Sequence, residues 1–84
     1  MKILNKKLNV VIIAGASGIG REIAAAYERE GSNVFVCDIS ESFIRSFKND
    51  FPNIFIKKAD VSIYKEVVNF FEKVRAETNS IDVL

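Results

Sequence analysis

The chain contains no histidine, no tryptophan and only one cysteine. Without histidine, a Ser-His-Asp or Cys-His nucleophilic arrangement is excluded, and no cluster of metal-ligating residues is evident. The lone Cys37 cannot form an internal disulfide, so a reducing, cytoplasmic compartment is the simpler interpretation. Its position inside an apolar run predicts a small core residue rather than a redox centre.

The sequence also lacks an excess of either charge and a long apolar run. Twelve basic and eleven acidic residues are scattered along the chain, so no extended field would attract nucleic acid or anionic lipid. The N-terminal lysines, Lys2, Lys6 and Lys7, precede an apolar stretch that is too short to span a bilayer. We therefore expect no nucleic-acid partner, no membrane association and no signal peptide.

The remaining composition is typical of one soluble globular domain. Hydrophobic residues make up 49% of the chain and charged residues 27%, which separates it from disordered sequences. A chain of this length buries only a modest core, so we expect marginal stability. No linker, repeat or low-complexity segment divides it, and the whole of residues 1–84 is expected to form one α/β domain.

Apolar runs rich in β-branched residues predict strands at Leu8–Ile13, Val34–Cys37 and Ile54–Ile56. The first run is nearly continuous, as in a strand that is buried on both faces of a parallel sheet. Ile81–Leu84 predicts the start of a fourth strand. Helical patterns separate these runs, and right-handed crossovers then make a doubly wound parallel sheet the expected fold.

Each predicted helix has its own start or stop signal. The first places Ile19, Ile23, Ala24 and Tyr27 at helical spacing and meets a stop at Gly31.

Ser40 is expected to cap a second, short helix, which must end near Asp50 because Phe51 precedes Pro52. Ser62 is expected to cap a third helix, whose apolar face consists of Val67, Phe70, Phe71 and Val74.

Three glycines occupy the turn between the first strand and the first helix. Gly15, Gly18 and Gly20 would let the main chain pass close to a diphosphate, which the amide groups and dipole of the helix start would bind. The opposing interpretation is a tight connection without a ligand, since glycine supplies positive φ angles wherever a turn needs them.

Acidic residues after the next two strands favour the ligand. Asp38 follows the turn by about twenty residues, where a carboxylate accepts hydrogen bonds from a ribose, and Asp60 precedes Val61 after the third strand. All three loops are expected at the carboxyl edge of the sheet, where such sheets bind ligands. Because a carboxylate repels the 2′-phosphate of NADP, NAD is favoured over NADP. The alternatives are that Asp38 is a helix-entry acid, or that Arg45 or Lys48 reaches back toward the phosphate.

These residues resemble the short-chain dehydrogenase/reductase family, whose members are NAD- or NADP-dependent oxidoreductases with a Rossmann fold. The resemblance covers essentially the whole chain and is densest in residues 15–24, 30–34 and 81–84. It implies that the glycine turn cradles the diphosphate, that Asp38 binds the adenosine ribose, and that Asp60 and Val61 border the adenine. The implied cofactor-binding residues are Gly15, Ser17, Gly18, Ile19, Gly20, Asp38, Ile39, Asp60 and Val61.

The turn departs from the family pattern Thr-Gly-x-x-x-Gly-x-Gly. An ungapped match from Gly18 puts Ile13 in the threonine position and Ala14 in that of the first glycine. A turn one residue shorter puts Ala14 in the threonine position and Gly15 first. The threonine hydroxyl is missing in both alignments, and the sequence leaves both open.

No catalytic residue is assigned. The family's Ser, Tyr and Lys lie beyond the part of the pattern present here, and neither Tyr27 nor Tyr64 has a lysine four residues on. The favoured hypothesis is the NAD-binding part of an oxidoreductase that acts on an alcohol or carbonyl substrate. The alternatives are a non-catalytic dinucleotide-binding module and a remnant without a ligand. In the family's strand order the fourth strand lies beside the first. Because only the start of that fourth strand is present, we expect the apolar strand Leu8–Ile13 to be poorly covered on one side and the chain to associate through that edge.

Overall fold

The computed structural model describes residues 7–84, so Lys2 and Lys6 lie outside the described part. Strands and helices alternate as the sequence predicts, which confirms the α/β class. The strands are β1 (Asn9–Ile13), β2 (Asn33–Asp38) and β3 (Phe55–Lys58). The helices are α1 (Gly18–Arg29), α2 (Glu41–Asp50) and α3 (Tyr64–Glu77).

The three strands form a parallel sheet in the order β1-β2-β3. The segment near the C-terminus lies on the other side of β1, where Val83 forms a parallel bridge with Val10. The Val11 amide donates to the Val83 carbonyl at 2.9 Å, and the Asp82 amide donates to the Asn9 carbonyl at 2.8 Å. The predicted fourth strand is therefore present as a bridge in the expected position, not as an extended strand. Its place makes β1 the point at which the strand order reverses.

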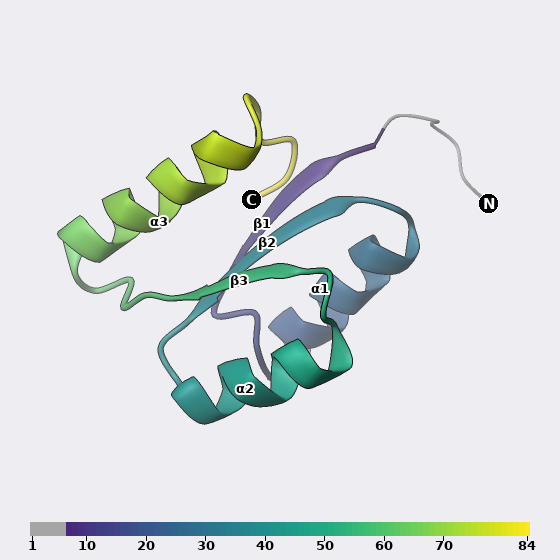
Figure 1. Cartoon of the computed structure of the whole chain (residues 1–84), viewed down its shortest axis with the longest axis horizontal. Helices are drawn as coiled ribbons and strands as arrows, with labels where there is room; N and C mark the ends of the chain where they lie inside the picture. The colour runs from purple at the N-terminus through teal and green to yellow at the C-terminus, as the bar shows by residue number, and fades with distance from the viewer. Residues whose placement is uncertain (1–6) are drawn as a thin grey trace.

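Helices cover both faces of the sheet, as a doubly wound fold requires. Figure 1 shows α1 and α2 on one face and α3 on the other. Side chains alternate along β2, so Val34 and Val36 pack with α1 and α2, whereas Phe35 and Cys37 join the α3 face. The two-sided burial predicted for Leu8–Ile13 is confirmed only at the centre of β1, where Val10 and Val11 are buried, while Ile12 and Ile13 are partly exposed. Strand β2 is the more deeply buried of the two, because all its residues from Val34 to Asp38 are buried.

The second helix begins and ends where the sequence predicts. The Ser40 hydroxyl accepts a hydrogen bond from the Phe43 amide at 3.3 Å, which confirms the N-cap of α2. The helix ends at Asp50, two residues before Pro52. At the end of α1, Gly31 has a φ of +86°, the left-handed conformation for which glycine is favoured.

The sequence-based prediction is wrong at several places. Strand β1 begins at Asn9 rather than Leu8, and β3 covers Phe55–Lys58 rather than Ile54–Ile56. Ser62 does not cap α3, because its hydroxyl donates to the Asp60 carboxylate and the N-cap position is Ile63. Ile19 and Ile23, expected on the packing face of α1, are 80% and 43% exposed.

Ala24, expected on the same face of α1, is buried as predicted, together with its neighbour Ala25. None of the helices in residues 7–84 has the length and apolar character needed to cross a membrane.

Candidate cofactor site

Main-chain hydrogen bonds hold together the loops that follow the three strands. The Gly15 amide donates to the Cys37 carbonyl at 3.2 Å, and the Ala59 amide donates to the Asp38 carbonyl at 3.0 Å. These bonds continue the β1-β2 and β2-β3 ladders past the strand ends. The glycine turn, the end of β2 and the loop after β3 are therefore neighbours at one edge of the sheet, as predicted.

Close packing explains two of the three glycines in the turn. A Cβ on Gly15 would lie 2.8 Å from side-chain carbons of Ile12 and Val36, so Gly15 fills a position between the strands. A Cβ on Gly20 would lie 2.7 Å from the Ala14 carbonyl oxygen. Gly20 therefore lets the first turn of α1 rest directly on the backbone of the turn.

Gly18 has a different reason to be glycine. Its φ is +58°, and a Cβ there would meet no atom within 4 Å. The space above this residue is open, so its main chain is accessible to a ligand. Ala14 also has a positive φ, +57°, in the region that favours glycine. This conformation favours the ungapped alignment, in which Ala14 takes the position of the first glycine.

The start of α1 has no internal cap. The N-cap residue Ser17 is extended and its side chain makes no capping hydrogen bond. No acidic residue lies in the first turn. The first amide groups of a helix have no partner within the helix, and the helix dipole favours negative charge there. The local structure thus leaves this helix start suited to an external anion.

Asp38 points toward the glycine turn. Its Oδ2 accepts a hydrogen bond from the Ala16 amide at 3.2 Å, and its Oδ1 accepts one from the Ser40 amide at 3.1 Å. The residue is only 8% exposed. Each carboxylate oxygen keeps further acceptor capacity, so the group can also accept from ribose hydroxyls. The interpretation of Asp38 as a helix-entry acid is confirmed, because its carboxylate accepts from the Ser40 amide just before α2. The same carboxylate also lies beside the glycine turn.

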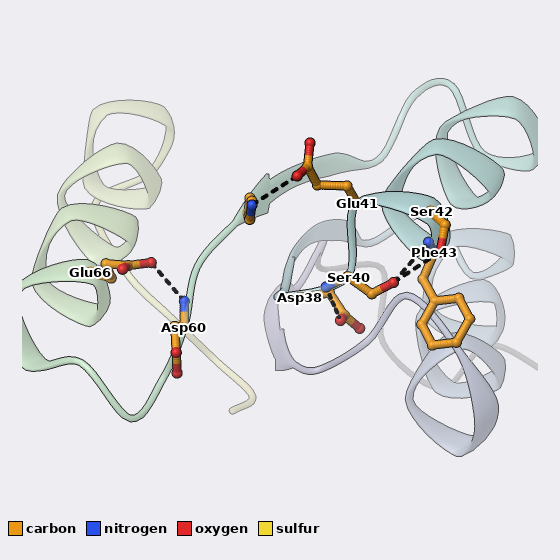
Figure 2. A network of polar contacts seen from close by, with 8 residues as sticks. Asp38, Ser40, Glu41, Ser42, Phe43, Asp60 and Glu66 are labelled. Carbon is orange, nitrogen blue, oxygen red and sulfur yellow. Dashed lines mark hydrogen bonds and ion pairs between the residues drawn. The ribbon is translucent and has the colours of Figure 1, made fainter.

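The loop after β3 is ordered around two carboxylates (Figure 2). The Asp60 Oδ1 accepts from the Ser62 hydroxyl at 2.6 Å and from the Ser62 amide at 2.9 Å. These two bonds hold the pKa of Asp60 below its usual range. The Asp60 amide donates to the Glu66 carboxylate at 2.8 Å, which ties the loop to the first turn of α3.

Exposed aliphatic side chains lie at this edge in the first turn of α1, after β2 and after β3. Ile19 is 80% exposed, Ile39 57% and Val61 50%. Water-exposed aliphatic groups next to the polar turn provide apolar surface that could contact an adenine or a nicotinamide ring. The predicted site residues are therefore all near one edge, but they divide into buried packing residues such as Gly15 and accessible ones such as Gly18.

The basic residues Arg45 and Lys48 line a hollow whose lining does not include Asp38. This hollow, of about 260 Å³, lies between α2 and β3 and is also lined by Lys57 and Lys58. Lys58 forms an ion pair with Glu41 at 3.0 Å, which holds the pKa of Glu41 below its usual range. No cation in residues 7–84 has an ion pair with Asp38.

A larger hollow of about 370 Å³ lies at the opposite, amino edge of the sheet. Residues from the loops before β2 and β3 line it, including Gly31, Asn33 and Asn53. No residue of the glycine turn and neither Asp38 nor Asp60 contributes to this hollow. Its position therefore separates it from the candidate site.

Metal and thiol chemistry have no support in the part of the chain described. No group of three or more His, Cys, Asp or Glu side chains there could hold a metal ion. Burial raises the pKa of the Cys37 thiol, and the neighbouring Asp38 charge raises it further. A buried thiol of this kind is inert, which agrees with the predicted role of Cys37 in the core.

The sequence analysis did not single out two residues that shape the site. The Ala16 amide is the partner of Asp38, and Arg21 donates to the Ala16 carbonyl at 3.4 Å. The turn sequence gives no sign of either contact, because both depend on how Asp38 and α2 are placed beside it.

Comparison with known proteins assigns the chain to a family. Residues 9–84 match the family model described as short chain dehydrogenase. The chain belongs to the short-chain dehydrogenase family. Over 75 residues it is 36% identical to the rat protein named dehydrogenase/reductase SDR family member 6, and the match covers 89% of this chain and 29% of that protein.

Solved structures agree with this assignment. An apo SCOR enzyme from Clostridium thermocellum has a TM-score of 0.82 at 26% identity, covering 93% of this chain and 32% of the other. YwfH, an NADPH-dependent reductase involved in bacilysin biosynthesis, has a TM-score of 0.82 at 18% identity. The match covers 93% of this chain and 36% of the YwfH chain. The chain spans less than half the length of the curated relatives, 28% of one fungal short chain dehydrogenase/reductase and 45% of another.

Proposed function

We propose that this chain binds a nicotinamide dinucleotide, with NAD favoured over NADP, and forms the cofactor-binding part of an oxidoreductase. In such an enzyme hydride passes between the cofactor and an alcohol or carbonyl substrate. The observation that carries the proposal is the start of α1, which has an open main chain at Gly18 and neither a side-chain cap nor an acidic residue in its first turn.

The surrounding residues fit the rest of the dinucleotide. The Asp38 carboxylate is held beside the turn and can accept hydrogen bonds from the adenosine ribose. Ile39 and Val61 offer exposed apolar surface on the two neighbouring loops, where the adenine would bind. Ser17, Ile19 and Gly20 would contact or support the diphosphate. Asp60 would order the loop after β3. Gly15 would allow the glycine turn to pack against the strands.

Asp38 also supports the preference for NAD. A carboxylate accepts from a 2′-hydroxyl and repels a 2′-phosphate, which dinucleotide sites for NADP meet with arginine. Among the described residues Arg45 and Lys48 form no ion pair with Asp38, and Arg21 is paired with Asp50. The buried free thiol of Cys37 is consistent with a cytoplasmic location, which is part of this proposal.

Titration of the 84-residue chain with NAD and with NADP tests the proposal. Isothermal calorimetry is expected to give one saturable site for NAD and weaker binding of NADP. At a hundred times the dissociation constant, NAD should raise the free energy of unfolding by about 2.7 kcal/mol. The matched variant Ser17→Asp adds a carboxylate at the helix start and should weaken binding by repelling the diphosphate. Absence of binding at millimolar NAD would contradict the proposal and would mean that the chain has the fold but does not bind this ligand.

The outer edge of β1 carries a separate prediction. Beyond the bridge to Val83, no strand of the described residues pairs with this edge. An apolar hollow of about 480 Å³ runs along it, lined by Ile12, Ile13, Ile23 and Tyr27 among others. We expect concentration-dependent association of the chain through this edge, measured by light scattering after size exclusion. A monodisperse monomer with cooperative melting would contradict this.

A further inference from the structure

Arg21 belongs to the first turn of α1 and has partners at the end of α2 and in the glycine turn. Its guanidinium forms an ion pair with Asp50 in the last turn of α2. The same group lies 5.6 Å from the ring centre of Phe47 and 5.3 Å from that of Phe51, within cation–π distance of both. Its Nη1 donates to the Ala16 carbonyl at 3.4 Å. The side chain is 22% exposed, so these contacts are partly screened from water.

The peptide groups around Ala16 are consequently held from two sides. Asp38 accepts from the amide of Ala16, whereas Arg21 donates to its carbonyl. That carbonyl belongs to the peptide whose amide is on Ser17, the N-cap of α1. Fixing its direction also fixes the direction of the Ser17 amide and the start of the helix that follows.

The other end of this contact is a well-defined part of α2. Phe47 is fully buried, and its ring lies 5.1 Å from that of Phe51. The helix ends here because Pro52 follows Phe51. The end of α2 thus provides two packed rings and a carboxylate, all of which contact Arg21.

We propose that Arg21 is a positioning residue for the cofactor site, which transmits the position of the end of α2 to the glycine turn through the Ala16 carbonyl. This inference rests on the proposed function, because the amides that it would orient are those offered to the diphosphate. Arg21 itself touches no cofactor in this account. A planar guanidinium is needed, since it stacks on the rings while donating in two directions, which a lysine ammonium cannot do.

The test compares Arg21→Gln, Arg21→Lys and the control Arg29→Gln, which removes the same charge from an exposed position in the last turn of the same helix. NAD affinity is measured by calorimetry, and amide hydrogen exchange of Ala16 and Ser17 is measured by NMR without ligand. Arg21→Gln should raise the dissociation constant about tenfold, equivalent to 1.4 kcal/mol. It should also speed exchange of the Ala16 amide several-fold, whereas Arg29→Gln should change neither quantity.

Arg21→Lys should keep the attraction to Asp50 but not the contact with the Ala16 carbonyl, so its affinity should stay well below that of the unmodified chain. A purely structural tie between the helices predicts the opposite pattern, in which stability falls while affinity and Ala16 exchange in the folded fraction stay unchanged. That pattern would overturn the inference.

Two further arms keep the outcomes separate. If Arg21→Gln does not fold, Asp50→Asn replaces it, because this variant keeps the arginine and both rings but weakens the ion pair that holds the guanidinium. The dissociation constant for NAD should then rise about threefold. An unchanged dissociation constant would overturn the inference. If the unmodified chain does not bind NAD, the proposed function fails. The exchange of the Ala16 amide then still decides whether Arg21 fixes the turn.

Discussion

Helices α1 and α2 both begin at the carboxyl edge of the sheet, but their starts differ. At α2, the Ser40 hydroxyl accepts from the Phe43 amide and Glu41 adds negative charge to the first turn. At α1, Ser17 makes no capping bond and the first turn contains no acidic residue. The orphan amides and dipole are thus satisfied within the chain at α2 and left open at α1. Of these two helix starts, that of α1 is therefore the one at which we propose that the diphosphate binds.

Asp38 connects the two helix starts. One carboxylate oxygen accepts from Ala16, just before α1, and the other accepts from Ser40, the cap of α2. Figure 2 shows Asp38 beside Ser40, with Phe43 extending from the first turn of α2. The internally capped helix therefore helps to hold the open one in place.

The largest effect should come from a substitution that prevents the close contact between α1 and the glycine turn. In Gly20→Ala, the added methyl group would meet the Ala14 carbonyl and the Gly15 Cα, which are backbone atoms that cannot turn aside. We expect a loss of about 3 kcal/mol in the free energy of unfolding, measured by urea denaturation.

The matched control is Gly18→Ala, where the space is open but φ is positive. It should cost only about 1 kcal/mol from backbone strain. Equal losses of stability in the two variants would mean that close packing at Gly20 does not matter more than the positive φ at Gly18.

Removing the shared acid should affect both helix starts. Asp38→Ala leaves the Ala16 and Ser40 amides without their acceptor, and we expect a loss of about 2 kcal/mol. Asp38→Asn keeps one acceptor oxygen and should lose less. Chemical denaturation of both variants measures the difference, and a loss below about 0.5 kcal/mol in Asp38→Ala would mean that the acid does not support the turn.

A pair of serine substitutions tests the comparison itself. Ser40→Ala removes a capping bond and should cost about 1 kcal/mol. Ser17→Ala removes no such bond, so its effect on stability should stay within about 0.5 kcal/mol. Thermal and urea denaturation of the two variants under identical conditions provide the measurement. A similar loss in both would mean that α1 is capped in solution as α2 is.

The smallest effect concerns the third helix start. Two hydrogen bonds from Ser62 lower the pKa of Asp60, so their stabilising effect is present above the pKa of the unfolded chain and is lost as pH falls through the folded value. Ser62→Ala removes the hydroxyl bond and should raise the Asp60 pKa toward its usual range.

An NMR pH titration of the Asp60 carboxyl carbon measures this shift. Ser80→Ala, a substitution of an exposed serine beyond α3, serves as the control and should leave the titration unchanged. An unchanged Asp60 titration in Ser62→Ala would mean that the hydroxyl bond does not persist in solution.

The sequence predicted the elements whose signals are local. The Ser40 cap, the end of α2 before Pro52 and the left-handed Gly31 all follow from the preferences of single residues, and the structure confirms them. The alternation of strands and helices also sufficed for the doubly wound fold. The family resemblance is confirmed by the match over residues 9–84.

The sequence failed where residues compete or where helix orientation decides. Ser62 is a residue type that commonly caps helices, but its hydroxyl donates to the Asp60 carboxylate instead. Ile19 and Ile23 have the spacing of core residues, yet of the predicted face only Ala24 and Tyr27 pack into the core. The role of Arg21 depends on α2 and cannot be inferred from the turn alone.

The central claim, that the start of α1 binds the diphosphate, is tested most directly by an NMR titration of the ¹⁵N-labelled chain with NAD. The account predicts saturable shifts that are largest for the amides of Gly18, Ile19 and Gly20, and much smaller ones for the capped first turn of α2. An unchanged spectrum at millimolar NAD, or shifts confined to the hollow at the amino edge of the sheet, would contradict it.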